Sequence, residues 1–152
     1  MKILLPVDGS ADALAAVRHA LALVRDGLQA DFVLANVQEP ASLYEMVVAH
    51  DPDVIVHVRS DAGADLLLPA EALLEAAGLS YESEVAGCQP ATVLVDLLEN
   101  YGCDAVVMGA RGAGSGSASV ATALLQRSPV PVTLVRAAEI EEPPPEPDPP
   151  EV

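Results

Sequence analysis

Short, nearly continuous apolar runs recur along the chain, and they restrict its fold more than any other feature. Four of them lie at residues 3–7, 31–37, 104–108 and 130–135. Runs of this kind are typical of strands that are buried on both faces of a parallel sheet. Residues 79–85 alternate apolar and polar side chains, which predicts a fifth strand that is less covered.

Helical patterns separate these strands. Residues 11–26 carry apolar side chains at spacings of three and four, and similar patterns predict helices over residues 62–77, from about Pro90 to Tyr101, and over residues 119–127. Strands that alternate with helices predict a parallel sheet with helices on both faces. Because crossovers are right-handed, we expect an α/β fold with a single doubly wound five-stranded parallel sheet, a Rossmann-like three-layer sandwich.

Residues 38–59 are the least regular part of the pattern, and we expect a variable connection there. Residues 44–48 suit a helical turn, and residues 54–58 have the composition of a strand. Pro69 falls inside the helix expected from residue 62, where it would kink that helix or restart it.

The charge of the chain excludes several kinds of partner. Its 152 residues carry 7 basic and 23 acidic side chains, a net charge of −16. Residues 137–152 hold six of the acids, no base and six prolines, so the remaining residues 1–136 carry −16 + 6 = −10. We expect one folded domain over residues 1–136 and an acidic, proline-rich, disordered tail after it. Neither nucleic acid nor an anionic membrane surface suits this charge.

The remaining composition favours a cytoplasmic protein. Two cysteines, Cys88 and Cys103, are too few for a disulfide framework and suit small buried positions in a reducing compartment. No apolar stretch is long enough for a membrane span, and the first residues do not form a signal peptide. The three histidines and two cysteines lack the spacing of a metal site, so no metal ligands are expected.

The strongest local signal is a loop rich in glycine and serine that follows one strand and opens a helix, from residue 109 to residue 117. Glycines let backbone amides approach phosphate oxygens, and a helix start adds free N–H groups and partial positive charge. Arg111 supplies a cation, and Ser117 and Ser119 supply hydroxyl donors. The loop matches neither the Walker A pattern nor GxGxxG after the first strand, so a flexible connection without a ligand remains an alternative.

Asp8 is the second signal, because it comes directly after the first strand. Such a carboxylate can accept a hydrogen bond from a ribose hydroxyl or an adenine amine, or hold a metal. Alternatively, it is an acid that favours the helix dipole. The loops after Val7, Val37 and Met108 all leave the carboxyl edge of the expected sheet, where ligands of such folds bind.

Three segments carry a resemblance to a known family. They are residues 3–10, with a strand followed by Asp-Gly-Ser, the Gly-Cys-Gln-Pro of residues 87–90, and the stretch from residue 104 to residue 136. On these motifs the chain resembles the universal stress protein family over residues 1–136. The resemblance implies a fold of the adenine-nucleotide α-hydrolase type. It also implies a homodimer that pairs through the last strand, at residues 132–135, where an apolar edge needs covering.

The resemblance also implies a nucleotide site. Pro6, Val7 and Asp8 would lie near the adenine or ribose, and the backbone of Val37 would meet the adenine. The other positions would form the phosphate loop: Met108, Gly109, Arg111, Gly112, Ser117, Ser119 and Val120. ATP or another adenine nucleotide is the implied ligand, with Mg²⁺ to screen its phosphates.

The phosphate loop departs from the family pattern of Gly-x-x-Gly, nine residues, then Gly-Ser/Thr. Only residues 113–117 separate Gly112 from Ala118, which stands where the second glycine is expected. Two hypotheses follow: a dimeric adenine-nucleotide-binding stress-response protein, or a degenerate member that binds no ATP and acts as a dimeric interaction module with a protein partner. Both predict a protein that is not an enzyme. In a third, nucleotide hydrolysis, Asp8 would have to activate water.

Overall fold

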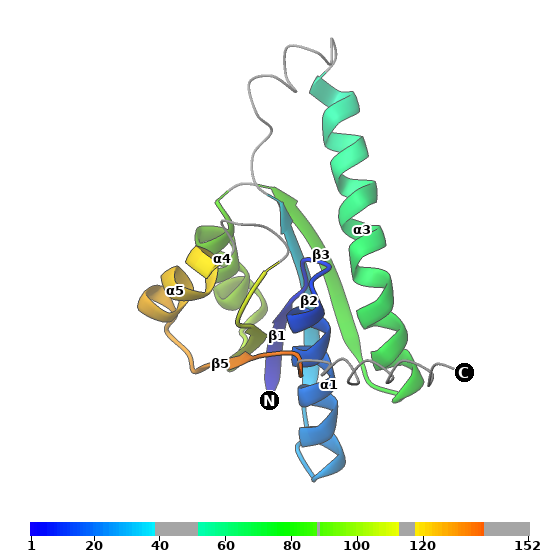
Figure 1. Cartoon of the computed structure of the whole chain (residues 1–152), viewed down its shortest axis with the longest axis vertical. Coiled ribbons are helices and arrows are strands. Elements are labelled where there is room, and N and C mark those ends of the chain that lie inside the picture. Colours follow the sequence, from blue (N-terminus) through cyan, green and yellow to red (C-terminus); the bar gives the residue numbers. More distant parts are fainter. Residues whose placement is uncertain (39–51, 88, 113–117, 139–152) are drawn as a thin grey trace, which may run out of the picture.

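The computed structural model describes residues 1–38, 52–87, 89–112 and 118–138. Five strands and four helices alternate through these residues (Figure 1). Their bounds are β1 Lys2–Pro6, α1 Ala11–Arg25, β2 Asp31–Gln38, α3 Pro52–Ala76, β3 Tyr81–Gly87, α4 Pro90–Tyr101, β4 Ala105–Gly109, α5 Ala118–Arg127 and β5 Val132–Val135.

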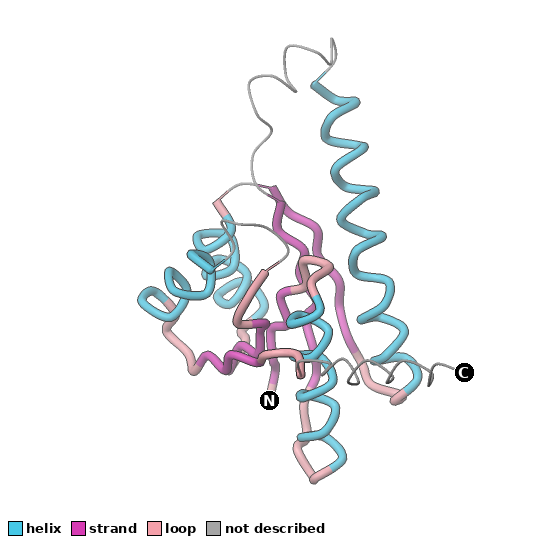
Figure 2. The backbone as a smooth tube through the Cα atoms, viewed as in Figure 1, coloured by secondary structure: helices cyan, strands magenta, loops and turns pink. Residues whose placement is uncertain are grey.

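All five strands form one parallel sheet in the order β3-β2-β1-β4-β5. The chain builds outward from β1 to β2 and β3, then returns to the other side of β1 for β4 and β5. This is the doubly wound arrangement that the alternating pattern predicts, so the expected fold class is confirmed. In Figure 2 the strands lie together, and the helices lie on either side of them.

Helices cover both faces of the sheet, and the side chains of β1 divide between them. Ile3 and Leu5 pack with α1 and α3, whereas Leu4 packs with α4 and α5. The face of α1 toward the sheet is lined by alanines, among them Ala16 and Ala20, which are fully buried. Small side chains let α1 approach the sheet closely, and the candidate site depends on this approach.

Helix α3 corrects the expectation for residues 38–59. It begins at Pro52, ten residues before the predicted start, so residues 54–58 are helical and do not form a strand. β-branched residues cost only a few tenths of a kcal/mol each, about 0.5 kcal/mol at most, in a helix. That cost is small beside the tertiary packing of Leu67, Ala70 and Leu74, which are buried in the same helix.

Pro69 was expected either to kink the helix or to restart it. One helix runs through it without interruption, so a restart at this residue is wrong. Proline has no N–H group, so one backbone carbonyl of α3 lacks its helical hydrogen bond at this point. Because Pro69 is exposed, water can donate a hydrogen bond to that carbonyl instead.

Several smaller expectations can be compared with the structure. Cys103 is a buried free cysteine, as predicted, and burial raises the pKa of its thiol. His19 is exposed on α1. The expected turn at residues 44–48, Cys88 and most of the predicted tail lie outside the described residues. Among the helices of the described residues, none is both long and apolar enough to span a membrane.

Candidate functional site

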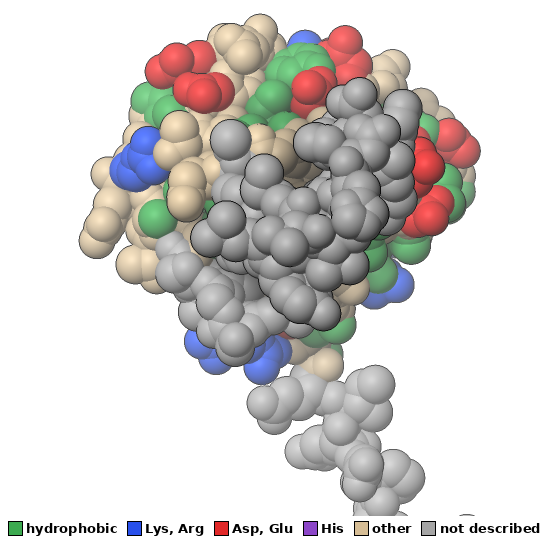
Figure 3. Space-filling model, turned by 90° about the horizontal axis from the view of Figure 1, so that it is seen from above, with side chains coloured by type: hydrophobic (Ala, Val, Ile, Leu, Met, Phe, Trp, Pro, Cys, Tyr) green, Lys and Arg blue, Asp and Glu red, His purple; other side chains and the backbone are tan. Residues whose placement is uncertain are grey.

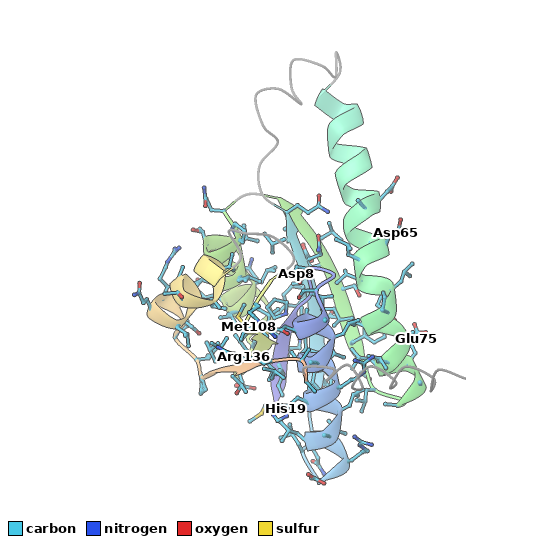
Figure 4. The ribbon with its side chains drawn as sticks, viewed as in Figure 1. Asp8, His19, Asp65, Glu75, Met108 and Arg136 are labelled. Atoms are coloured by element: carbon cyan, nitrogen blue, oxygen red, sulfur yellow. The ribbon has the colours of Figure 1, made fainter. Side chains whose placement is uncertain are left out.

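The carboxyl edge of the sheet contains a topological switch point between β1 and β4. These strands are neighbours, but β1 leads toward β2 and β4 leads toward β5 on the opposite side. The loops that follow them therefore diverge, and ligands of doubly wound folds bind in the opening that results. Asp8 follows β1 here, and Met108 is the last residue but one of β4, toward the same edge (Figure 4).

The turn after β1 is held by its own polar groups. The Val7 amide donates to the Ala35 carbonyl at 2.8 Å, which extends the pairing of β1 with β2 beyond Pro6. The Ser10 amide donates to Asp8 Oδ1 at 2.9 Å. The Ser10 hydroxyl in turn accepts from the Ala13 amide at 3.1 Å and caps α1. These bonds fix the position of the Asp8 carboxylate at the edge of the sheet.

The end of β4 lies unusually close to the start of α1. A Cβ atom added to Gly109 would stand 2.7 Å from the Ala13 nitrogen, 2.8 Å from the Asp12 carbonyl carbon and 2.9 Å from the Asp12 Cβ. Real Cβ atoms do not approach backbone atoms so closely. Gly109 was predicted as a phosphate-loop glycine; what the structure shows is that the close approach of strand to helix leaves no room for a Cβ there.

Because α1 and the end of β4 lie so close together, the Asp12 carboxylate can bind the loop after β4. Its Oδ2 accepts from the Arg111 backbone amide at 3.0 Å and from Arg111 Nε at 2.9 Å, and its Oδ1 accepts from Arg111 Nη2 at 3.2 Å. Oδ1 also accepts from the Ala137 amide at 2.9 Å. One carboxylate therefore joins the first turn of α1, the loop after β4 and the segment after β5.

This contact keeps Asp12 ionised. Hydrogen bonding from the Arg111 side chain, then from the Ala137 amide, lowers the pKa of Asp12 from 3.8 to about 2, against a smaller opposing effect of burial. The Asp12 side chain is 5% exposed and that of Arg111 is 55% exposed. The half-exposed Arg111 side chain thus pairs with a nearly buried carboxylate.

Two amides at the start of the loop face the protein. The Ala110 amide donates to the Val135 carbonyl at 2.8 Å, and the Arg111 amide donates to Asp12. An N–H group that is already bonded inside the fold is not a donor for a ligand phosphate. A backbone cradle for phosphate therefore cannot use the amides of residues 110 and 111.

The remaining predicted site residues divide between the two faces of the sheet. Met108, Val37 and Val120 belong to the core on the α4 and α5 side, and Arg111 turns toward α1 on the other side. Ser119 lies in the first turn of α5, whereas Ser117 is outside the described residues.

Asp12 is the residue that the sequence analysis missed. The available signal was its spacing, because it stands four residues before Ala16 and eight before Ala20 on the buried stripe of that helix. An acid on a buried stripe needs a charged or hydrogen-bonding partner.

Asn36 is a second buried polar residue at this edge, with 2% of its surface exposed. Its Nδ2 donates to the Val7 carbonyl at 2.9 Å, whereas its Oδ1 has no hydrogen-bond partner among the described residues. A Cβ on Gly63 would lie 2.8 Å from that oxygen, so Asn36 points under α3 and away from the face that carries Val37. The described residues contain no group of three or more acids, cysteines or histidines placed to hold a metal ion.

The fold defines a class of protein, the Rossmann-like α/β proteins with one doubly wound, five-stranded parallel sheet. Within that class, the sequence model of the universal stress protein family matches residues 1–136. The chain belongs to this family, and the resemblance seen in the sequence is confirmed.

Solved structures agree with this assignment. Universal stress protein UspA from Lactobacillus plantarum superposes with a TM-score of 0.75 at 19% identity, over 90% of this chain and 97% of that one. A universal stress protein in complex with cAMP gives 0.64 at 22% identity, over 91% and 98%. A family protein from Arabidopsis thaliana with AMP bound gives 0.67 at 16% identity, over 95% and 96%. No curated protein matches the chain.

Proposed function

We propose that this chain is a stress-response protein that binds an adenine nucleotide at the carboxyl edge of its sheet, without turning it over. The observation that carries the proposal is the topological switch point at the carboxyl ends of β1 and β4, in a chain that belongs to the universal stress protein family. Two family structures were solved with cAMP or AMP, which supports an adenine nucleotide as the ligand.

The described residues suggest how the ligand would be oriented. The Asp8 carboxylate, held by the Ser10 amide, would accept from a ribose hydroxyl or from the adenine amine. The apolar side chains on the α4 and α5 face, with Val37 at the end of β2, would border the base. Phosphate would lie toward the loop that starts at Gly112, where Mg²⁺ could accompany it.

Thermal unfolding tests this proposal directly. At a concentration about 100 times its Kd, a ligand that binds only the native state adds about 2.7 kcal/mol of stability, which raises the Tm of a domain of this size by about 5–10 °C. We expect such a rise with AMP, cAMP or ATP·Mg and none with the matching guanine nucleotide. The Asp8→Asn variant should bind about tenfold more weakly because a charged acceptor is replaced by a neutral one.

The matched control is Asp26→Asn, which removes the same charge from the exposed C-cap of α1, at the other end of that helix. It should leave binding unchanged. If none of these nucleotides shifts the Tm at millimolar concentration, nucleotide binding is refuted. Phosphate release from ATP by the unaltered chain, and its loss in Asp8→Asn, would instead establish a hydrolase.

A second candidate function is a dimeric interaction module that binds no nucleotide. The observation that favours it is the internal use of the Arg111 side chain and of the amides of residues 110 and 111. It would be supported by unchanged Tm values with every nucleotide together with a folded, dimeric chain.

In either function we propose a homodimer that pairs through β5. This strand is an edge of the sheet, and Leu134 remains 39% exposed on it. An apolar edge of this kind needs a partner. Sedimentation should give a dimer for the unaltered chain and a monomer for Leu134→Arg, whereas the same change at Leu125, which is exposed on α5, should leave the dimer intact.

A further inference from the structure

Asn36 holds a buried polar atom that no group in the described part of the chain satisfies. The residue is 2% exposed, its Nδ2 donates to the Val7 carbonyl at 2.9 Å, and its Oδ1 has no partner there. Turning the amide over does not help, because the Val7 carbonyl accepts hydrogen bonds and cannot donate one. A buried oxygen without a partner costs stability, so leucine, which is apolar and of similar size, would suit folding better at this position.

The hydrogen bond that Asn36 does make lies where the pairing of β1 with β2 ends. The Val7 amide donates to the Ala35 carbonyl at 2.8 Å, and this is the last backbone hydrogen bond between the two strands in the described residues. The next bond of a parallel ladder would run from the Val37 amide to the Val7 carbonyl. The side chain of Asn36 donates to that carbonyl in its place.

The end of the ladder leaves two backbone groups of Val37 directed past the end of β1. Backbone groups along a strand alternate between its two neighbours, so the N–H and C=O of Val37 face the same side as those of Ala35, toward β1. Strand β1 has already ended at Pro6. In the described residues no backbone hydrogen bond reaches these two groups from β1 or from the turn after it. They form a donor and an acceptor beside the switch point.

We propose that Asn36 is a positioning residue for adenine: by occupying the Val7 carbonyl, it keeps the amide and the carbonyl of Val37 available to the edge of the base. This inference rests on the proposed nucleotide-binding function and concerns how that site recognises its base. Adenine presents an amine donor beside a ring-nitrogen acceptor, which complements one carbonyl and one N–H group. Hypoxanthine presents a carbonyl acceptor and an N–H donor at the same positions, so it meets the backbone pair with like groups.

The charge of the chain makes these contacts to the base more important. Seen from the end toward which β2 and β3 point, acidic side chains gather along the rim, whereas basic ones are few and scattered (Figure 3). The net charge of −16 gives an anionic ligand no long-range attraction. Hydrogen bonds to the base therefore supply a larger share of the affinity than they would in a basic protein.

The test compares AMP with inosine monophosphate in calorimetric titrations of the whole chain. The two nucleotides share the ribose and the phosphate, so the ratio of their Kd values reports recognition of the base alone. The unaltered chain should bind AMP at least about tenfold more tightly, because the wrong base leaves polar groups unpaired. Asn36→Leu removes the donor to the Val7 carbonyl and lets the Val37 amide take its place, so the preference for AMP should fall by about tenfold.

Stability separates this role from a purely structural one. Asn36→Leu removes an unpartnered buried oxygen, so its midpoint of urea unfolding should equal or exceed that of the unaltered chain. The matched control is Asn100→Leu, the same change at an exposed position of α4, which should leave the midpoint and the ratio unchanged. An unchanged ratio in Asn36→Leu overturns the inference, and so does an equal change of the ratio in Asn100→Leu.

The Val37 amide gives a second measurement, which decides the question if Asn36→Leu does not fold. In the unaltered chain its proton resonance should shift with AMP and much less with inosine monophosphate, and its hydrogen exchange should slow only when AMP is bound. In Asn36→Leu the exchange should be slow without ligand, because the added ladder bond protects the amide. An amide that is slow to exchange in the free unaltered chain, or that does not respond to bound AMP, overturns the inference.

Failure of the inference and failure of the proposed function give different results. If AMP binds and the unaltered chain does not prefer it to inosine monophosphate, nucleotide binding stands and the role of Asn36 is wrong. If neither nucleotide binds to the unaltered chain, the proposed function fails and the inference fails with it.

Discussion

Substituting Gly109 with alanine is the most direct test of how β4 meets α1. The added Cβ would stand 2.7 Å from the Ala13 nitrogen and 2.8 Å from the Asp12 carbonyl carbon, whereas ordinary contacts begin at 3.4 Å. Both atoms belong to the backbone of the first turn of α1, so no side chain can rotate away. Either α1 or the end of β4 has to move by several tenths of an ångström.

The expected cost follows from these distances. Overpacking a tight interior site costs about 1–3 kcal/mol, and the upper end applies because backbone atoms must shift. Alanine also restricts the unfolded chain, which returns about 0.4–1 kcal/mol. The net loss in the free energy of unfolding is therefore about 2 kcal/mol, or about 4–8 °C in Tm for a domain of this size.

Urea unfolding followed by circular dichroism measures this loss as a lower midpoint at unchanged slope. Gly87→Ala is the matched control, since it is also a glycine at the carboxyl end of a strand and its added Cβ would meet only the Gln38 carbonyl oxygen, at 4.0 Å. That variant should be unchanged or more stable by about 0.5 kcal/mol. Equal stabilities for Gly109→Ala and the unaltered chain would refute the close approach of β4 to α1.

Three further predictions address other elements. Pro69→Ala should raise the free energy of unfolding, measured in urea, by about 2 kcal/mol. An exposed proline inside a helix destabilises it by about 3 kcal/mol, and part of this is offset because proline also restricts the unfolded chain. A loss of stability in this variant would contradict the prediction. The pKa of Asp12 is lowered from 3.8 to about 2, so its stabilisation is present above about pH 4 and is lost as the pH falls toward 2, and in Asp12→Asn that part of the acid unfolding curve should disappear. The hydrogen bond to Glu75 raises the pKa of Tyr81 from 10.0 to about 12, so the stabilisation from this pair is present below pH 10 and is lost as the pH rises toward 12; absorbance titration of Glu75→Gln should show a tyrosine that ionises earlier.

The sheet could be predicted from the sequence because its evidence is local and repeated. Each buried strand has its own run of apolar residues, and each helix has its own helical spacing of apolar side chains. A wrong prediction for one element therefore leaves the predicted order of the others unchanged. The strand prediction for residues 54–58 was wrong for the same reason, because it too used only local evidence. Their β-branched composition favours a strand locally, and nothing within those residues indicates that they continue the helix whose packed half contains Leu67 and Leu74.

The candidate site was less accessible to sequence reasoning, because its main contact is not local. Asp12 and Arg111 are 99 residues apart, and Asp12 and Ala137 are 125 apart. Read separately, Asp12 is an acid in a first helical turn and Arg111 is a cation in a glycine loop. Only the strand order, which brings β4 beside β1 and its crossover helix, shows that each residue neutralises the other.

The same contact affects which helix start suits a ligand phosphate. All four helices of the described residues follow strands and begin at the carboxyl edge of the sheet, and α1 and α5 are the two that follow the strands at the switch point. At the start of α1, the Ser10 hydroxyl accepts from the Ala13 amide, and the Asp12 carboxylate places a negative charge in the first turn. That charge offsets the partial positive charge of the helix start. In the proposed function we therefore expect phosphate nearer the start of α5, which begins at Ala118, than the start of α1.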